Sequence, residues 1–141
     1  MALNVMVVDD SAVMRSVIIK TLKMSGLAVG EIFEARNGVE GLQLLQDNWV
    51  DLALLDINMP EMNGEEMLER VRETPETSDL NVIVVSTEGS ESRINHLKSL
   101  GASFVHKPFS PEQLRNVVIE LTGESYGTVS TPSFGSSDSD F

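Results

Sequence analysis

The chain contains no cysteine and few cations. Of its 141 residues, 10 are lysine or arginine and 22 are aspartate or glutamate, which gives a formal net charge of -12. Without cysteine there can be no disulfide, no thiolate metal site and no cysteine nucleophile, and this composition fits a reducing compartment. The excess of acids repels a polyphosphate backbone, so we expect no direct binding to nucleic acid.

The chain also lacks long apolar runs. Its first residues, MALNVMVVDD, reach two acids after a short apolar stretch, which fits neither a secretory signal nor a membrane span of about 20 residues. We therefore expect a cytoplasmic protein that does not bind membranes. The length is close to the ~150 residues typical of one domain, and a hydrophobic share of 41% is that of an ordinary globular domain.

Short runs rich in valine, isoleucine and leucine alternate with stretches whose apolar residues recur at helical spacing. The short runs predict five strands, at Asn4–Val8, Glu31–Ala35, Asp51–Leu55, Asn81–Val85 and Ser103–Val105. The longer stretches predict five helices, at Ala12–Met24, Val39–Gln46, Glu65–Arg72, Glu91–Leu100 and Pro111–Leu121. Ser11 and Asn37 suit helix starts, Gly26 suits a helix end, and Pro111 suits a first helical position.

The run Asn81–Val85 is almost continuously apolar, which indicates a strand buried on both faces and hence a central parallel sheet. Repeated strand–helix units with short connections then predict a doubly wound (βα)5 three-layer α/β sandwich. From Gly123 onward the composition shifts to serine, threonine, glycine and proline, which cannot bury enough apolar surface to become ordered. We expect one domain over residues 1–123 and a disordered tail over residues 124–141.

Polar residues follow four of the predicted strands, and an open parallel sheet binds ligands outside the carboxyl ends of its strands. The residues at these ends are Asp9, Asp10, Asp56, Ser86, Thr87 and Lys107. Carboxylates brought together repel one another unless a cation binds or a proton is retained. Mg²⁺ takes oxygen ligands and commonly combines one or two carboxylates with a phosphate, while a lysine and a hydroxyl can hold phosphoryl oxygens. The set therefore indicates phosphoryl chemistry.

Each of these residues also has an ordinary structural explanation. Acids and a serine before a helix often only cap the helix and complement its dipole. Turn chemistry accounts for an aspartate after a strand, and a single lysine is commonly just solvated. The combination of all of them at one edge of the sheet is what favours a site.

The same residues fall within longer motifs between about Val5 and Leu121. The motifs are Val7-Val8-Asp9-Asp10-Ser11 with Arg15, Asp56-Ile57-Asn58-Met59-Pro60 with Gly64, Val85-Ser86-Thr87-Glu88, Gly101-Ala102-Ser103 and Lys107-Pro108-Phe109. Together they resemble the receiver domains of two-component signalling, most closely the stand-alone chemotaxis regulators of the CheY type. The resemblance implies a flavodoxin-like sheet with the strand order 2-1-3-4-5.

The resemblance implies that Asp56 is the phosphoacceptor, which attacks a phosphohistidine of a partner kinase and becomes an acyl phosphate. Asp10 and Asp56 would bind Mg²⁺, for which Mn²⁺ can substitute, through their carboxylates. Asn58 would bind the ion through its backbone carbonyl and Asp9 through a metal-bound water. Lys107 would pair with Asp56 and later with the phosphoryl group, and the Lys107–Pro108 peptide bond would be cis.

Further residues are implied to switch or modulate this site. Ser86 would bond the phosphoryl oxygen and, with Thr87, draw the following loop inward, which opens space for the aromatic side chain of Phe104. Several relatives carry tyrosine at that place, so Phe104 keeps the apolar ring but lacks a hydroxyl. Asn58 and Glu88 would flank the phosphoryl group and influence its lifetime.

The implied function is a signalling switch that catalyses its own phosphorylation and dephosphorylation but converts no separate substrate. Its partners would be a sensor histidine kinase, a downstream protein target such as a flagellar motor switch protein, and a phosphatase, and we expect a monomer. A phosphorelay shuttle, a phosphate sink or the excised receiver of a transcriptional regulator remain alternatives. A hydrolytic aspartyl-phosphate phosphatase fits less well, because enzymes resembling haloacid dehalogenases place their nucleophile in an Asp-x-Asp pattern after the first strand.

The remaining conspicuous side chains have simpler explanations. We expect four methionines to fill the core, namely Met14, Met24, Met62 and Met67. His96 and His106 are expected at the surface, His106 beside Lys107, and Trp49 is expected to anchor packing at a helix end. Three cations of the last two helices are either solvated or part of a partner face, namely Arg93, Lys98 and Arg115.

Overall fold

Five strands and five helices alternate along the chain in the computed structural model, which describes residues 2–57, 64–87 and 90–122. The strands are β1 (Leu3–Val8), β2 (Val29–Ala35), β3 (Leu52–Leu55), β4 (Asn81–Ser86) and β5 (Ser103–His106). The helices are α1 (Ala12–Met24), α2 (Gly38–Asp47), α3 (Gly64–Glu73), α4 (Glu91–Ser99) and α5 (Pro111–Thr122). All strands are parallel and lie in the order β2-β1-β3-β4-β5, which confirms the predicted topology.

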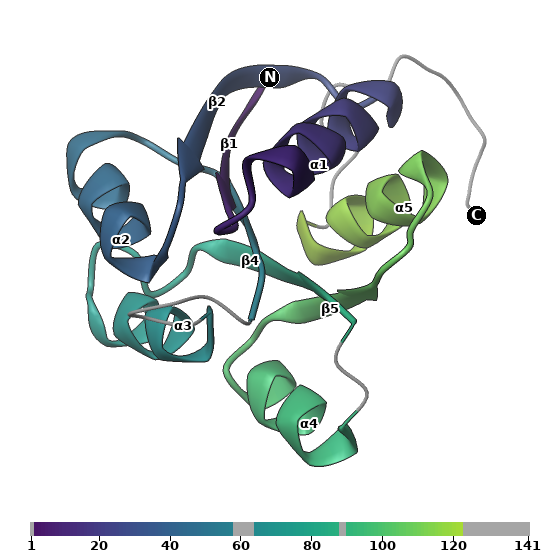
Figure 1. Cartoon of the computed structure of the whole chain (residues 1–141). Coiled ribbons are helices and arrows are strands. Elements are labelled where there is room, and N and C mark those ends of the chain that lie inside the picture. Colours follow the sequence, from purple (N-terminus) through teal and green to yellow (C-terminus); the bar gives the residue numbers. More distant parts are fainter. Residues whose placement is uncertain (1, 58–63, 88–89, 123–141) are drawn as a thin grey trace, which may run out of the picture.

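The helices cover both faces of this sheet and make three layers (Figure 1). On one face, Ile18 and Leu22 of α1 and Leu114 of α5 belong to a single buried cluster. On the other face, the buried cluster contains residues of α3 and α4, and leucines of α2 pack against it. This arrangement is the predicted doubly wound α/β sandwich.

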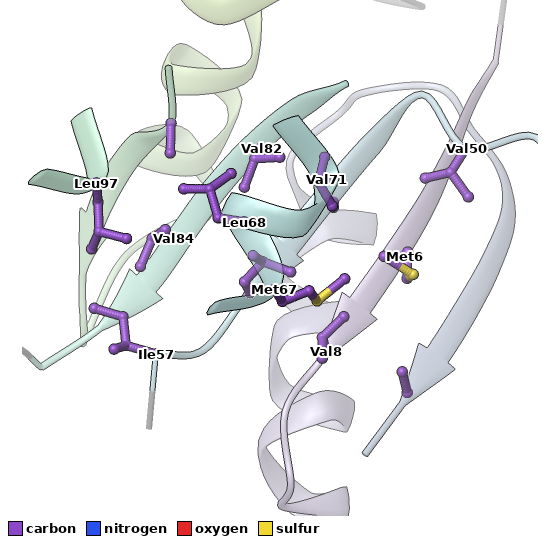
Figure 2. Packing of buried hydrophobic residues seen from close by; sticks show 14 residues of the cluster. Met6, Val8, Val50, Ile57, Met67, Leu68, Val71, Val82, Val84 and Leu97 are labelled. Carbon is purple, nitrogen blue, oxygen red and sulfur yellow. The ribbon is translucent and has the colours of Figure 1, made fainter. Parts of the chain in front are cut away.

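The nearly continuous apolar strands follow from burial on both faces. In β4, Val82 and Val84 belong to the cluster under α3 and α4, whereas Ile83 and Val85 belong to the cluster under α1 and α5, and all four are fully buried. Figure 2 shows the cluster under α3 and α4, in which Met67 of α3 packs against the sheet. Alternate side chains of one strand thus serve two cores, as in other covered parallel sheets.

Helix boundaries follow the expected capping residues. The Ser11 hydroxyl accepts a hydrogen bond from the backbone N–H of Met14 at 3.2 Å, and Gly26 after α1 has a φ of 89°. At the start of α5, the Ser110 hydroxyl accepts from the N–H of Gln113, whose side chain accepts in return from the N–H of Ser110. This reciprocal pair satisfies two backbone donors that the helix itself cannot use.

Three sequence-based expectations are wrong in detail. Strand β2 begins at Val29 rather than Glu31, because Val29 pairs with Leu3 of β1, and the Asn4 side chain accepts from the N–H of Glu31 where the register shifts between Leu3 and Val5. Met24 is 63% exposed, since it ends α1 on the side turned away from the sheet. Trp49 is 75% exposed and packs into no core, because it lies in the α2–β3 connection at the amino edge of the sheet.

Of the other three methionines expected in the core, two lie in described segments and one does not. Met67 is fully buried, and Met14 packs at the margin of the cluster under α1 and α5, as expected. Met62 and the expected tail over residues 124–141 lie outside the described residues. Within the described segments, no helix has both the length and the apolar character that crossing a bilayer requires.

Candidate phosphoryl-transfer and metal site

The carboxyl ends of neighbouring strands bring the predicted site residues to one edge of the sheet. The N–H of Asp56, just after β3, donates to the carbonyl of Val8 at 2.9 Å, which sets Asp56 beside the end of β1. The N–H of Lys107, just after β5, donates to the carbonyl of Ser86 at 2.9 Å, at the end of β4. Parallel pairing therefore aligns residues that are far apart in the sequence.

Three carboxylates and one ammonium meet at this edge. One ligand oxygen from each of Asp9, Asp10 and Asp56 lies within 4.8 Å of the others. The Lys107 Nζ lies 3.7 Å from Asp9 Oδ2 and 3.8 Å from Asp56 Oδ1. Asp9 and Asp56 are buried and Asp10 is exposed, so solvent reaches the cluster at Asp10.

Asp9 is the most confined member of the cluster. Its Oδ1 accepts a hydrogen bond of 2.9 Å from the Ser11 N–H, whereas its Oδ2 is buried and accepts no hydrogen bond from the described part of the chain. Burial raises the pKa of the Asp9 carboxyl above its ordinary value, and neighbouring Asp10 acts in the same direction, while the Ser11 hydrogen bond and Lys107 oppose them. The charged form of Asp9 is therefore disfavoured mainly by burial, and Lys107 offsets this only in part.

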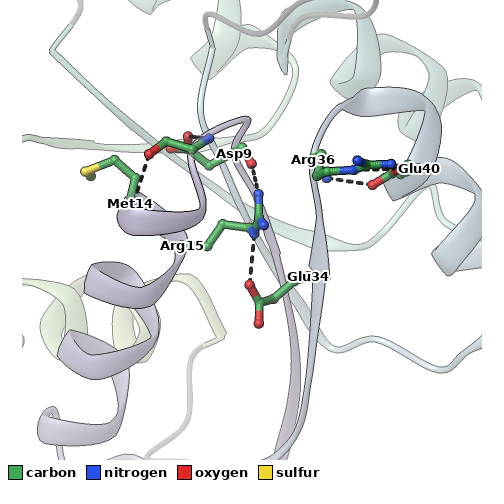
Figure 3. Close-up of polar contacts among 7 residues, drawn as sticks. Asp9, Met14, Arg15, Glu34, Arg36 and Glu40 are labelled. Carbon is green, nitrogen blue, oxygen red and sulfur yellow. Dashed lines mark hydrogen bonds and ion pairs between the residues drawn. The ribbon is translucent and has the colours of Figure 1, made fainter.

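Arg15 braces the segment that carries Asp9. Its Nη1 donates to the Asp9 carbonyl at 2.7 Å, and its Nε donates to Glu34 of β2 at 2.8 Å (Figure 3). The ionic pair is largely shielded on the arginine side, where the side chain is 12% exposed. Sequence reasoning placed Arg15 in a motif without a structural role, because its partners are a backbone carbonyl and a residue on the next strand.

Gly64, the first residue of α3, packs directly against the backbone of Asp56 and Ile57. Its N–H donates to the carbonyl of Ile57 at 2.9 Å, which closes the connection from β3 to α3. A Cβ at this position would overlap the carbonyl oxygen of Asp56 and lie 3.0 Å from the Ile57 Cα. Only glycine therefore permits this close approach of the helix start to the backbone at Asp56.

The residues implied to act as a switch surround the end of β4 and β5. Ser86 is 1% exposed, Thr87 is exposed, and Phe104 is half-buried and pairs in register with Val84. The Lys107–Pro108 peptide bond is cis, as the resemblance implies. Asn58 and Glu88 lie outside the described residues.

Both histidines lie at the surface, as expected, and each contacts a neighbouring side chain. His106 is exposed, as expected, but its ring makes an edge contact with Phe104, with centroids 5.1 Å apart. His96 is also exposed, yet its Nε2 lies 3.3 Å from Glu69 and 3.7 Å from Glu65 across the α3–α4 contact. The sequence alone does not predict these contacts, because His96 lies 27 to 31 residues from the two glutamates and on a different helix.

The three cations of the last two helices differ in their surroundings. Arg93 pairs with Glu65 at 3.4 Å, and Lys98 is exposed. Arg115 is half-buried, and its Nε has no hydrogen-bond partner among the described residues. The expectation that these side chains are solvated therefore holds best for Lys98.

The donor set fits a hard divalent cation. It offers carboxylate oxygens only, two of the three carboxylates are buried, and the Asp9 Oδ2 has no hydrogen-bond donor. A cation such as Mg²⁺ would neutralise the repulsion among the three carboxylates and would keep coordination positions for water and a phosphate. Lys107 stands beside the carboxylates, where it can neutralise a phosphoryl group as a point charge.

Comparison with known proteins agrees with this fold and this set of residues. The sequence model of the family described as "Response regulator receiver domain" matches residues 5–119, and the chain belongs to this family. Receiver domains are the phospho-accepting modules of two-component systems, so the chain is a phospho-accepting signalling switch.

The chain is 37% identical to a chemotaxis protein CheY homolog of Campylobacter jejuni over 127 residues, which cover 89% of this chain and 96% of the relative. It is 36% identical to the chemotaxis protein CheY1 of Helicobacter pylori over 123 residues, or 86% of this chain and 98% of the relative. The structure of the chemotaxis protein CheY4 of Vibrio cholerae superimposes with a TM-score of 0.75 at 30% identity, over 86% of this chain and 99% of the other.

Proposed function

We propose that Asp56 is the phosphoacceptor of this receiver and that the donor is a phosphohistidine of a sensor histidine kinase. A carboxylate oxygen of Asp56 attacks phosphorus, a new P–O bond forms, and the P–N bond breaks, so that the histidine leaves with the electron pair. The observation that carries the proposal is the place of Asp56, at the end of a central strand with the Lys107 Nζ 3.8 Å from its carboxylate. The ammonium can neutralise charge on the transferred group.

Asp10 and Asp56 are proposed to bind Mg²⁺, or Mn²⁺ in its place, with the Asn58 carbonyl as a further ligand and Asp9 acting through a water. The bound ion supplies charge neutralisation to the carboxylates and to the phosphoryl oxygens. The proximity of the three carboxylates and the unsatisfied Oδ2 of Asp9 support this assignment. Arg15 and Ser11 hold Asp9 in place from its backbone carbonyl and its Oδ1.

The switch is proposed to run from Ser86 to the α4–β5 side of the domain. Ser86 would donate its hydroxyl to the phosphoryl group and, with Thr87, draw the following loop inward, while Asn58 and Glu88 would flank the phosphoryl group and influence its lifetime. Phe104 would then turn into the space that opens. The backbone link between Ser86 and Lys107 and the half-buried position of Phe104 beside Val84 support a coupling between these residues.

The switch is proposed to act in chemotaxis in the cytoplasm, as a monomer that a histidine kinase phosphorylates and that a phosphatase can reset. Its output would be binding to a protein target such as a flagellar motor switch protein. The chemotaxis proteins among the relatives support this pathway, since each aligns over nearly its whole length. In this scheme the protein catalyses its own phosphorylation and dephosphorylation and converts no separate substrate.

A titration with Mg²⁺ and beryllofluoride tests the switch, because beryllofluoride on an aspartate stands in for a phosphoryl group. In ¹⁵N–¹H spectra, we expect amide shifts at Asp56 and Lys107 together with shifts along β4, α4 and β5. The matched control is Asp56→Asn, which should remove both sets of shifts. Shifts confined to the edge that carries Asp56 would contradict the switch, and unchanged shifts in Asp56→Asn would contradict the acceptor.

A further inference from the structure

A second concave surface lies at the amino edge of the sheet, opposite the carboxylate site. It is a hollow of about 590 Å³ between residues 45–51, which lead from α2 into β3, and residues 75–81, which lead from α3 into β4. Its volume is that of many binding pockets. Because it lies at the beginnings of the strands, an occupant would leave the carboxyl edge free.

The lining combines apolar surface with acids and contains no cation. Leu45, Val50 and Leu80 contribute apolar side chains. Four carboxylates belong to the same lining, namely Asp47, Asp51, Glu76 and Asp79. No lysine, arginine or histidine is among the lining residues, so the walls of the hollow carry an excess of negative charge, which Arg72 behind the wall offsets only near Asp79.

Trp49 stands at this hollow with its ring in solvent. The residue is 75% exposed, the highest value among the large hydrophobic residues that the structure describes as exposed. Its Nε1 donates to Asp51 Oδ1 at 2.9 Å, and Asp51 Oδ2 accepts from the Asn4 N–H at 2.9 Å. Two polar links to the sheet therefore fix an exposed aromatic ring, which is the kind of residue that dominates binding at protein interfaces.

The opposite wall is also held in place. The Thr77 hydroxyl donates to the carbonyl of Val71 at 2.8 Å, and the Leu80 N–H donates to the Thr77 carbonyl at 3.0 Å. Arg72, the cation next to Asp79, turns inward and donates to the carbonyls of Ser78 and Leu80. It therefore stabilises the wall without facing the hollow, and a partner pays little ordering cost on binding.

We propose that this hollow is a docking surface for a basic segment of a partner protein, with an arginine or lysine side chain over the Trp49 ring and paired with Glu76 and Asp79. An aromatic face beside carboxylates attracts a cation through both the ring quadrupole and the charges. A second copy of this chain is a poor occupant, because its net charge of -12 repels an acidic surface. The proposal is independent of phosphorylation and goes beyond it.

The test uses a synthetic probe, the peptide acetyl-Leu-Arg-Ala-Arg-Leu-Arg-amide, and the same peptide with glutamate for each arginine. Trp49 is the only tryptophan of the chain, so its emission reports binding directly. In ¹⁵N–¹H spectra, we expect the arginine peptide to shift amides within residues 45–51 and 75–81, and the glutamate peptide to shift none of them. Phosphorylation by acetyl phosphate should be unchanged in the presence of either peptide.

Matched variants separate a docking surface from general attraction to an acidic protein. In the ¹⁵N–¹H titration, which does not need the tryptophan signal, we expect Trp49→Leu, and separately Glu76→Gln with Asp79→Asn, to weaken binding of the arginine peptide at least fivefold. The control pair Glu91→Gln with Glu112→Gln removes two exposed charges elsewhere and should change binding less than twofold. Equal weakening by the control pair, or shifts spread over other acidic faces, would overturn the proposal. So would sedimentation showing that Trp49→Leu dissociates a dimer of this chain.

Discussion

Asp9→Asn tests the charge of the carboxylate site with almost no change in shape. The substitution replaces one buried oxygen by an amide nitrogen, and the remaining side-chain oxygen can still accept the hydrogen bond from the Ser11 N–H. It removes a carboxylate whose other oxygen has no hydrogen-bond donor. We expect the metal-free protein to become more stable, because a desolvated charge disappears while its useful contact remains.

The magnitude follows from the distances in the cluster. Two unit charges 4.8 Å apart, the outer limit between the three carboxylates, repel by about 3.5 kcal/mol at an effective dielectric constant of ~20. Lys107, 3.7 Å from Asp9, attracts by about 4.5 kcal/mol on the same scale. Repulsion from Asp10 and Asp56 together exceeds that attraction, but solvent screens the exposed Asp10. A gain of about 1–2 kcal/mol in the free energy of unfolding is expected near pH 7.

The pH dependence has a definite sign. The pKa of Asp9 is raised in the folded protein, so its carboxyl holds a proton more tightly when folded than when unfolded. The native protein therefore loses stability, relative to Asp9→Asn, as the pH rises from the unfolded value of about 3.9 through the folded pKa. Below that window the Asp9 carboxyl is protonated in both the folded and the unfolded state, and the stability advantage of Asp9→Asn should vanish.

Urea denaturation with chelator measures the stability of the metal-free proteins, and a second series with millimolar Mg²⁺ measures how much the ion adds. Ligand binding to the native state adds stability according to its affinity, so Mg²⁺ should stabilise the native protein and leave Asp9→Asn nearly unchanged. A lower stability of Asp9→Asn than of the native protein, in chelator at pH 7, would refute the predicted gain. Equal stabilisation of both proteins by Mg²⁺ would refute the role of Asp9 in metal binding.

Three further substitutions test the supports of the fold and site by denaturation. Gly64→Ala should cost about 1–3 kcal/mol and slow phosphorylation, because the new methyl group overlaps the Asp56 carbonyl; unchanged stability would contradict that packing. Arg72→Lys should cost about 2 kcal/mol, since an ammonium cannot replace a guanidinium that donates to carbonyls in three directions; full stability in the lysine variant would show that charge alone suffices. Ser11→Ala should cost about 1 kcal/mol through the lost helix cap, and Ser11→Asp should restore it.

Features set by local chemistry or by the period of the apolar pattern could be predicted from the sequence. The alternate burial of Val82, Ile83 and Val84 in two cores is the direct result of an apolar strand in a covered parallel sheet. Asp9 and Asp56 follow their strands at once, and parallel pairing then places them together without further information. Their roles rest on the resemblance, and stay predictions.

Features that depend on partners distant in the sequence could not be predicted. Arg15 and Arg72 bind backbone carbonyls, which every residue carries, so no sequence signal marks those bonds. The sequence predicts that Trp49 anchors packing at a helix end, but the residue lies in the connection before β3 and is exposed, with its Nε1 bonded to Asp51. His96 meets its acids only through the packing of α4 against α3.

The phosphoacceptor can be identified most directly by mapping the labelled residue. The protein is incubated with acetyl phosphate and Mg²⁺, the acyl phosphate is reduced with borohydride, and the peptides are examined by mass spectrometry. We expect a single modified residue, Asp56, with no label in Asp56→Asn or in the presence of chelator. A label that persists in Asp56→Asn, or that forms on Asp9 or Asp10 in the native protein, would contradict this assignment.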